Sequence, residues 1–316
     1  MAKQVEDAYI VAATRTPIGK APRGTFKTVR PDDLLVHALR SLLARVPKLD
    51  ANLVEDVIVG CAMPEAEQGA NVARTSVLLA GLPNTIGGVT VNRFCASGTT
   101  ALAMAADRIR VGEADVMIAA GTESMSMIPM GGNTPSLNPN VFTRDENVGI
   151  AFGMGITAEK VAQRWNVSRE DQDAFALSSH RKAIAGRESG AFDDEITPFE
   201  FEEHVPDLAN GSVVVRKRGL KFDEGPRADT SLDALAKLKP AFAAKGSVTA
   251  GNSSQMSDGA GALLLVSERT LKRLDLTPLA RFVSFAVKGV PPEIMGIGPK
   301  EAIPAALAKA ELKLDD

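Results

Sequence analysis

The sequence is poor in the residues that build covalent frameworks and metal centres. Its 316 residues include only two cysteines and three histidines, and 4% of the residues are aromatic. Two cysteines cannot form a disulfide framework in a chain of this length, so we expect a protein of the reducing cytoplasm. No Cys-x-x-Cys pair or histidine-rich cluster occurs, which argues against a structural zinc site.

Long apolar runs and a strong charge imbalance are also missing. The longest apolar runs, such as residues 262–266, fall far short of the roughly 20 residues that a membrane-spanning helix needs. The N-terminal residues show no basic segment leading into an apolar stretch, so no secretory signal is expected. A net charge of −3 gives no basic field for nucleic acid. The composition is that of a soluble globular protein with about two domains.

The first 121 residues contain a regular alternation of strand-like and helix-like segments. Short apolar runs predict strands, and apolar residues spaced at i, i+3, i+4 and i+7 predict amphipathic helices between them. This alternation indicates an α/β fold with right-handed crossovers. The expected strands cover residues 8–13, 54–60, 89–94 and 116–120, and the expected helices cover residues 32–46, 70–79 and 98–111.

The pattern changes after residue 121 and returns near residue 259. Residues 122–150 are rich in Met, Gly, Asn, Pro and Ser, which predicts a long ordered loop. Helix caps are expected at Ser168 and Thr230, because an acidic residue follows each of them three positions later. Helices are expected at 157–165, after Ser168, at 231–242 and at 298–307 (kinked at Pro304), and strands at 259–266, rejoining the first sheet, and at 280–287.

A basic run covers residues 216–221 in an otherwise acidic protein. A run of this kind is most often a solvated charged face. The alternative interpretation is a binding site for a phosphorylated ligand. The sequence leaves both open.

Cys95 is the strongest candidate for chemistry. It lies at a predicted strand-to-helix junction, and Ala96, Ser97 and Gly98 leave room for another molecule. The N-terminus of a helix presents unpaired N–H groups and a partial positive charge, which favour a thiolate and can hold an oxyanion. The alternative is that Cys95 is a small buried hydrophobic residue, the commonest fate of a free cysteine. Cys61, at the end of a strand, is interpreted as structural.

A nucleophilic thiol also needs a base. The three histidines are His37, His180 and His204, and none lies in a glycine-rich loop of the kind that presents a catalytic imidazole. Each is predicted to be a surface residue. If Cys95 is the nucleophile, its partner is either one of these histidines brought close by the fold or a group absent from the chain.

Five segments resemble the thiolases, the acetyl-CoA acyltransferases. The segment 91–98 (Val-Asn-Arg-Phe-Cys-Ala-Ser-Gly) resembles the family's nucleophile segment. The others are similar to the segment after the fourth strand, to two parts of the loop domain and to the CoA-side loop, and they lie at 121–126, 154–159, 168–176 and 249–260. Their common order and spacing make the resemblance specific, and it extends over most of the chain.

The resemblance implies a layered α/β fold of two similar βαβ halves. In this chain the first half is expected to be complete, with an inserted loop domain, and the second half to be largely missing. The expected domains are an N-terminal core of residues 1–121 and 248–275, an inserted loop domain of residues 122–247, and the start of a C-terminal domain at residues 276–316.

The resemblance also implies the site. Cys95 would be acylated and would pass its acyl group to a second CoA. Met154, Arg227, Ala250 and Ser254 fall where the family contacts CoA, and Arg227 follows the basic run closely enough to favour its phosphate-binding interpretation. The implied partners are CoA and acyl-CoA as substrates, with no other cofactor, in a homodimer or homotetramer.

The segment 65–71 is more similar to the degradative 3-ketoacyl-CoA branch of the family, the branch of fatty acid β-oxidation, than to the acetoacetyl-CoA biosynthetic one. The family's Asn-Glu-Ala-Phe, Gly-His-Pro and Cys-x-Gly-Gly segments do not occur in the sequence. Loss of a general base typically slows a reaction by about 10²–10⁴-fold, so turnover by this chain alone is in question.

The sequence suggests three possible functions. The first is an acyltransferase that cleaves 3-ketoacyl-CoA, or runs the reverse condensation, through an acyl-cysteine. The second is a catalytically incomplete, acyl-CoA-binding or truncated relative. A ketoacyl synthase, which shares the fold and a cysteine nucleophile, is disfavoured because the loop-domain and CoA-side segments resemble thiolases.

Overall fold

The computed structural model of the protein describes residues 5–316, which form two units. Unit 1 holds the described residues up to Thr134 together with Gly190–Gly225 and Gln255–Phe282. Unit 2 holds Pro135–Ser189, Pro226–Ser254 and Val283–Asp316. Each unit is described by itself below.

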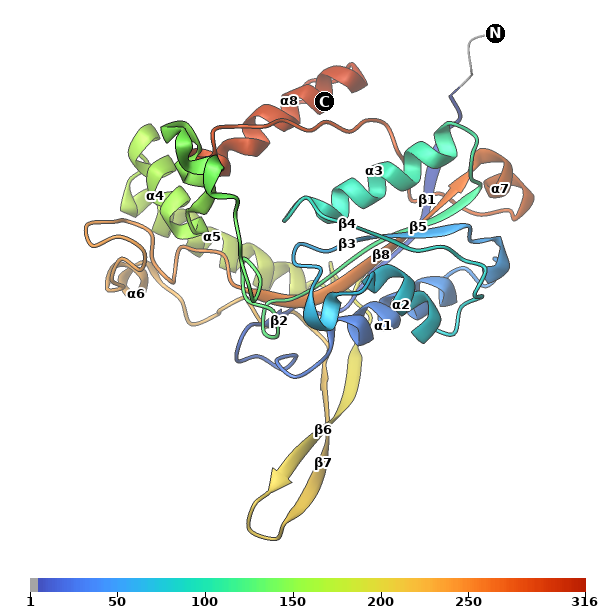
Figure 1. Cartoon of the computed structure of the whole chain (residues 1–316), viewed down its shortest axis with the longest axis horizontal. Helices are drawn as coiled ribbons and strands as arrows, with labels where there is room; N and C mark the ends of the chain where they lie inside the picture. Colours follow the sequence, from blue (N-terminus) through green and yellow to red (C-terminus); the bar gives the residue numbers. More distant parts are fainter. Residues whose placement is uncertain (1–4) are drawn as a thin grey trace. The chain divides into compact units, whose positions relative to one another are not determined.

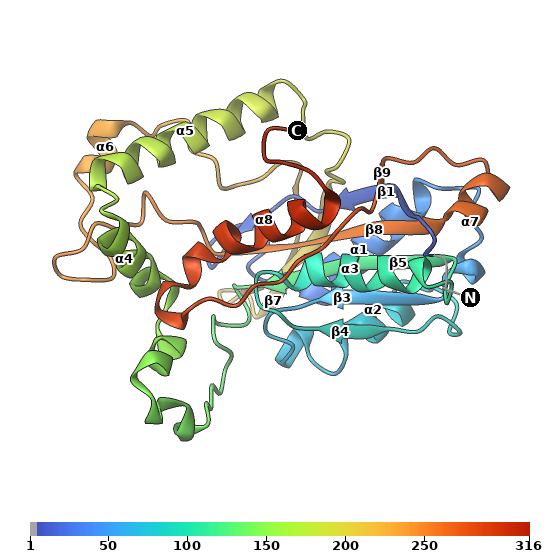
Figure 2. The same ribbon diagram turned by 90° about the horizontal axis from the view of Figure 1, so that it is seen from above.

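A seven-stranded mixed sheet forms the centre of unit 1 (Figures 1 and 2). Its order is β4-β3-β5-β8-β1-β9, with the short β2 paired to β8. The strand β3 runs parallel to β4 and β5, whereas β8 runs antiparallel to β5 and β1. The strands are β1 (Ala8–Arg15), β2 (Gly19–Lys20), β3 (Asp56–Gly60), β4 (Val89–Val91), β5 (Val116–Ser124), β8 (Ser257–Ser267) and β9 (Ala280–Arg281).

Helices cover both faces of this sheet. Because side chains alternate along a strand, Val57 and Val59 of β3 join one buried cluster and Ile58 joins another. The helices α1 (Pro31–Ala44) and α2 (Val72–Leu79) lie on the first face, and α3 (Ser97–Arg110) lies on the second (Figure 1). Small side chains on α3, such as Ala101 and Ala105, let the helix approach the sheet closely. The short α7 (Glu268–Arg273) follows β8.

Most elements predicted for the first 121 residues are confirmed, and so is the return of the chain to the sheet as β8. Two predicted strands are shorter than expected. The strand predicted at 89–94 ends at Val91, because the chain turns before α3. The strand predicted at 280–287 is only Ala280–Arg281, which pairs with Tyr9 and Ile10 of β1.

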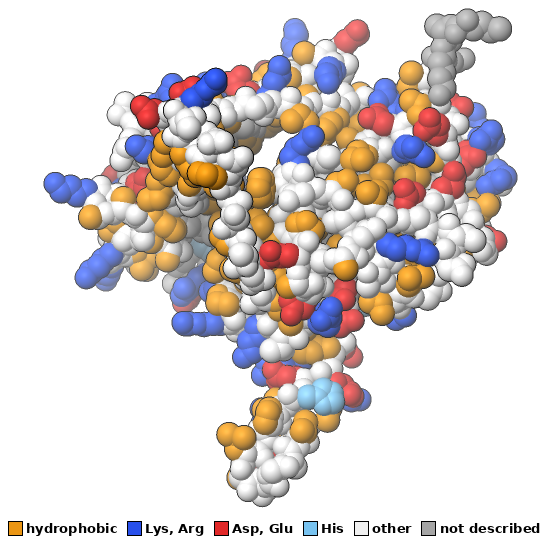
Figure 3. Space-filling model, in the orientation of Figure 1, with side chains coloured by type: hydrophobic (Ala, Val, Ile, Leu, Met, Phe, Trp, Pro, Cys, Tyr) orange, Lys and Arg blue, Asp and Glu red, His pale blue; other side chains and the backbone are white. Residues whose placement is uncertain are grey.

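A hairpin that the sequence reading missed projects from unit 1 (Figure 1). It consists of β6 (Phe199–Asp207) and β7 (Ser212–Leu220), joined through Gly211 at a positive φ of 62°. The Phe-Glu-Phe-Glu alternation and the Asn-Gly turn were the available signals. Figure 3 shows hydrophobic side chains along the hairpin, and those of Leu208, Val213 and Val215 are exposed.

The basic run 216–221 lies mostly on β7. Every residue of β7 before Leu220 is exposed. Across the hairpin, Glu202 faces Lys217 and Glu203 faces Arg216 in register, and the Nε atom of Arg218 lies 3.1 Å from a carboxylate oxygen of Glu203. This arrangement is that of a solvated charged strand with acidic neighbours.

Unit 2 is built from helices and irregular segments. Within the predicted loop 122–150, two 3-10 helices form, η3 (Pro139–Thr143) and η4 (Asp145–Ala151). The Ser168 cap is confirmed, since its Oγ accepts the Asp171 N–H at 3.0 Å. The other helices are α4 (Met154–Trp165), α5 (Arg169–Glu188), α6 (Leu232–Ala236), η5 (Pro292–Ile297) and α8 (Gly298–Ala310, which contains Pro304).

The helix predicted at 231–242 was wrong in length and in its cap. It is α6, of five residues, and its cap is Ser231, whose Oγ accepts the Ala234 N–H at 3.2 Å. Pro240 disfavours a helical conformation of the residue before it, and it pairs instead with Thr249 in an isolated bridge. The chain is therefore free to turn after Ala236.

The boundaries of the two units differ from the predicted domain boundaries. Residues 190–225, predicted within the inserted domain, belong to unit 1, where the hydroxyls of Thr14 and Thr197 are 2.8 Å apart and Arg15 pairs with Asp223 at 2.7 Å. Residues 283–316 belong to unit 2, where η5 packs on α4. Among residues 5–316, no helix is long and apolar enough to cross a membrane.

Candidate active site

The turn between β4 and α3 carries Cys95. The side-chain oxygen of Asn92 accepts the Phe94 N–H at 2.8 Å, and the backbone N–H of Ala96 donates to the Arg93 carbonyl at 3.0 Å. Phe94 adopts a left-handed conformation with φ of 45°. The helix α3 begins at Ser97, two residues after the cysteine. The predicted strand-to-helix junction at Cys95 is confirmed.

The start of α3 packs directly on the end of β3. A Cβ atom at Gly60 would lie 2.4 Å from the carbonyl carbon of Ser97 and 2.5 Å from the Gly98 nitrogen. Backbone atoms at such distances cannot move aside cheaply, so only glycine fits at position 60. This contact fixes where the helix begins relative to the sheet.

Cys95 is exposed, and several amides of the turn and of the first turn of α3 are unpaired. In the described chain, the N–H groups of Cys95, Gly98 and Thr99 donate to no protein acceptor. They lie at the N-terminus of the 14-residue helix α3, where the helix dipole is positive. Unpaired amides in this position suit an anionic sulfur, or an oxyanion formed on a carbonyl that the sulfur attacks.

Cys61, interpreted from the sequence as structural, has the opposite environment. Its side chain is 1% exposed in the core beneath α1 and α2. Burial, followed by the nearby Glu123 carboxylate, raises the pKa of the Cys61 thiol to about 12. The thiol is therefore protonated at neutral pH and unsuited to nucleophilic attack.

Two carboxylates near these strand ends, the half-buried Glu123 and the buried Asp258, were not predicted. Glu123 accepts the Ala62 N–H at 2.6 Å and the Gln68 amide, and burial raises its pKa. Asp258 is fully buried and accepts a hydrogen bond from the Ser126 hydroxyl at 2.6 Å. Both hold loops at the ends of strands. Glu123 follows a buried strand in the sequence, which was the available signal.

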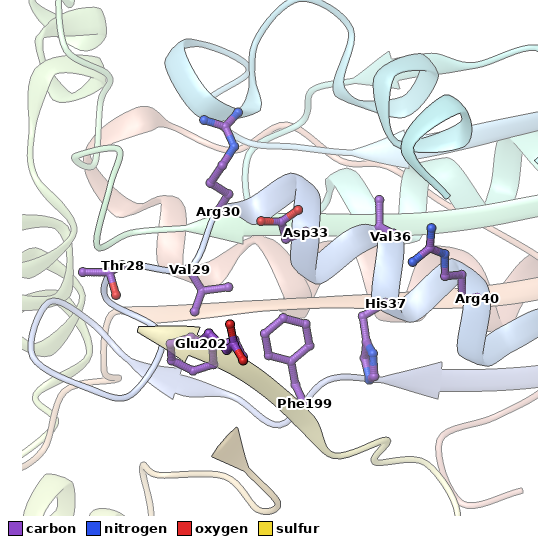
Figure 4. A pocket seen from close by; sticks show the side chains of 10 residues that line it. Thr28, Val29, Arg30, Asp33, Val36, His37, Arg40, Phe199 and Glu202 are labelled. Carbon is purple, nitrogen blue, oxygen red and sulfur yellow. The ribbon is translucent and has the colours of Figure 1, made fainter. Parts of the chain in front are cut away.

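The histidines are not all surface residues, so that prediction was wrong for two of them. His37 is half-buried against Phe199, with ring centroids 5.0 Å apart, and burial lowers its pKa. Both rings line a cavity of about 480 Å³, and none of residues 92–97 lines it (Figure 4). His180 is half-buried and its Nδ1 accepts the Arg227 N–H at 3.1 Å. Only His204, on β6, is exposed.

The four predicted CoA contacts all lie in unit 2, whereas Cys95 lies in unit 1. Met154 is the first residue of α4 and is 40% exposed. Arg227 is exposed and pairs with the exposed Asp229 at 3.0 Å. Ala250 and Ser254 are exposed in the loop that precedes β8. All four side chains are thus open to a ligand.

The loop that carries Ala250 and Ser254 is fixed by polar contacts that the sequence did not predict. Asn252 accepts the Thr249 N–H at 2.7 Å and donates to the buried Asp173 at 2.9 Å. The buried Glu159 accepts the Val248 N–H at 2.9 Å. These contacts tie the loop to α4 and α5. Across residues 5–316, no group of three or more His, Cys, Asp or Glu side chains could hold a metal ion.

Comparison with known proteins identifies the family of the chain. Residues 8–269 match the family described as Thiolase, N-terminal domain. The chain is 48% identical to 3-ketoacyl-CoA thiolase of Bacillus subtilis (strain 168), over 99% of this chain and 79% of that protein. It is 44% identical to the peroxisomal 3-ketoacyl-CoA thiolase 1 of Arabidopsis thaliana, over 98% of this chain and 69% of that protein.

The fold has a solved counterpart in the crystal structure of the Bacillus anthracis acetyl-CoA acetyltransferase. The TM-score is 0.83 with 38% identity, and the match covers 99% of this chain and 79% of that one. The fold is thus that of an acyl-transferring enzyme. The chain belongs to the thiolase family, which confirms the resemblance carried by the five sequence segments.

Proposed function

We propose that this protein is an acyl-CoA acyltransferase that cleaves 3-ketoacyl-CoA with CoA through an acyl-Cys95 intermediate. The observation that carries the proposal is the exposed Cys95 just before α3, where its own N–H and those of Gly98 and Thr99 are unpaired in the described chain. The sequence identity to 3-ketoacyl-CoA thiolases supports the substrate class. The same steps run in reverse would condense two acyl-CoA molecules.

The reaction balances in two transfers. The Cys95 thiolate attacks the 3-keto carbon, the bond between C2 and C3 breaks, and C2 takes up a proton to release acetyl-CoA. The thiol of a second CoA loses a proton, its sulfur attacks the acyl-Cys95 thioester, and the shortened acyl-CoA leaves as the Cys95 thiolate is restored. In each transfer the carbonyl oxygen gains negative charge, which the unpaired amides stabilise.

Arg227 is the best candidate for holding the phosphates of CoA, with Met154, Ala250 and Ser254 lining the rest of the bound molecule. Its guanidinium is exposed and forms an ion pair with the exposed Asp229. An exposed pair of this kind contributes little, so a phosphate can replace Asp229 at small cost. We expect Arg227→Ala to raise the KM for CoA several-fold while the rate at saturating CoA changes little.

Thiolysis of a 3-ketoacyl-CoA tests the function directly. The purified chain is mixed with 3-ketooctanoyl-CoA and CoA, and acetyl-CoA formation is followed by chromatography, beside Cys95→Ser and the matched control Cys61→Ser. We expect product from the wild type and from Cys61→Ser, and none from Cys95→Ser. Binding of CoA with no product from any of the three would instead favour an acyl-CoA-binding role.

Several finer properties belong to the same proposal. We place the enzyme in fatty acid β-oxidation, in the cytoplasm, as a homodimer or homotetramer that needs no cofactor besides its CoA substrates. The names of the related proteins support the pathway. Light scattering during gel filtration tests the assembly, and a monomer at micromolar concentration would contradict it.

A further inference from the structure

The residue before the proposed nucleophile is strained. Phe94 has φ of 45°, in the left-handed region that bulky side chains rarely adopt, and its side chain is 61% exposed. Burial of the ring therefore does not hold the conformation. A strained residue persists only where its surroundings fix it. Two polar side chains do so here, beside the backbone hydrogen bond from the Ser97 N–H to the Phe94 carbonyl at 2.9 Å.

Ser97 bridges the turn from its far side. Its Oγ accepts the Arg93 N–H at 2.8 Å and donates to the Phe94 carbonyl at 2.6 Å. The side chain is 3% exposed, so water does not replace these bonds when they are lost. Asn92 holds the other side, because its side-chain oxygen accepts the Phe94 N–H at 2.8 Å. Both peptide groups of Phe94 are thus fixed by side chains.

We propose that Ser97 and Asn92 are positioning residues, which hold Phe94 in its left-handed conformation and thereby aim the Cys95 sulfur and N–H at the acyl carbonyl. The inference rests on the proposed acylation of Cys95. Rotation of Phe94 toward an ordinary φ would redirect the next residue, which is Cys95. Displacement of a reacting group by about 1 Å can cost on the order of 10²-fold in rate.

Two reagents distinguish the orientation of Cys95 from the intrinsic reactivity of its thiolate. Acylation by acyl-CoA needs the sulfur and the amides in one geometry, whereas iodoacetamide is small and needs only an accessible thiolate. We expect Ser97→Ala to slow acylation of Cys95 by about 10- to 100-fold. Alkylation by iodoacetamide should change by less than about threefold, with the same pH profile. Asn92→Ala should act in the same direction, and Asn92→Asp, which keeps the accepting oxygen, should restore the rate.

The controls use other residues of unit 1. Ser76 is a buried serine whose Oγ has no hydrogen-bond partner, so Ser76→Ala should leave acylation unchanged. Glycine adopts the left-handed region without strain, so Phe94→Gly added to Ser97→Ala should recover most of the lost acylation rate. Thermal unfolding of each variant shows whether it is folded.

Acylation is followed by intact mass after mixing with acetyl-CoA. If Ser97→Ala is acylated as fast as the wild type, the inference is overturned and the proposed function still stands. The inference is also overturned if the folded double variant Ser97→Ala, Phe94→Gly is acylated as slowly as Ser97→Ala alone. A wild type that takes no acetyl group overturns the proposed function and the inference with it.

Discussion

The ends of two adjacent strands, β3 and β4, carry the two cysteines of the chain and give them opposite properties. The strands run parallel with Gly60 beside Val91, and the Cys61 N–H donates to the Val91 carbonyl at 3.1 Å. After β3 the chain leads Cys61 into the core. After β4 it makes a tight turn that leaves Cys95 exposed before α3. The backbone that follows each strand decides which thiol can react.

Charge acts in the same direction as exposure. Glu123 and burial both favour the protonated form of Cys61, as its raised pKa of about 12 records. Cys95 instead lies beside unpaired amides at the positive end of a helix. Of the two strand ends, the one that a helix follows directly is the one that leaves its cysteine exposed.

The largest expected difference between the two strand ends is in alkylation. In native protein at pH 8, iodoacetamide should modify Cys95 at least about 10³-fold faster than Cys61, because Cys61 is buried and protonated. Peptide mass spectrometry over a time course measures both rates in one sample, and denatured protein is the control in which the rates should converge. Comparable alkylation rates in native protein would show that the two thiols do not differ in reactivity.

The contact between the end of β3 and the start of α3 can be disrupted by one methyl group. Gly60→Ala should lower the free energy of unfolding by about 2 kcal/mol or more, because the new Cβ would meet the backbone of Ser97 at 2.4 Å. The matched control is Gly98→Ala, where nothing lies within 4 Å of the added atom. Urea unfolding measures both.

The Gly60→Ala variant should also be acylated more slowly at Cys95, because the start of α3 must shift to accept the methyl group. If Gly60→Ala is as stable as the wild type and acylates normally, the close packing of β3 on α3 is not what fixes the turn. Gly98→Ala should be at least as stable as the wild type.

A smaller effect should appear at alkaline pH. The pKa of Cys61 is raised in the folded protein to about 12 from an ordinary value of 9.0, so its contribution to stability is complete below pH 9 and is lost as pH rises toward 12. Between pH 8 and pH 10 the wild type should lose about 1 kcal/mol more of its free energy of unfolding than Cys61→Ala does. Equal losses in urea titrations would show that Cys61 ionises freely when folded.

The smallest effect should come from the hairpin of β6 and β7, which lies in the same unit but carries neither cysteine. Arg218→Ala removes a partly exposed ion pair with Glu203 and should cost less than about 1 kcal/mol. Acylation and alkylation of Cys95 should both stay at the wild-type rate. A slower acylation in this variant would mean that the basic run contributes to the site after all.

The sequence predicted the framework of unit 1 because its signals are local. Apolar periodicity located β3, β5, α1 and α3, and the small residues after Cys95 placed the cysteine at the start of a helix. The strand before it was drawn too long, because a phenylalanine gives no sign that it will adopt a positive φ. That conformation depends on the side chains of Asn92 and Ser97, which only the folded turn brings into place.

Longer-range features were beyond the sequence reading for the same reason. The exposure of Cys61 and Cys95 depends on which helices cover each strand end, and the raised pKa of Cys61 depends on Glu123, which is 62 positions away in the chain. The half-buried His37 depends on Phe199 of the hairpin. The hairpin itself was predictable, since an Asn-Gly turn joins two alternating segments.

The most direct test of the account locates the acyl group. The wild-type protein is mixed with isotopically labelled acetyl-CoA, quenched in acid, digested, and mapped by tandem mass spectrometry. The account predicts a hydroxylamine-labile acetyl group on Cys95 and none on Cys61, and it predicts that added CoA removes the label as acetyl-CoA. Label on Cys61, or a protein that carries no thioester at Cys95, would contradict it.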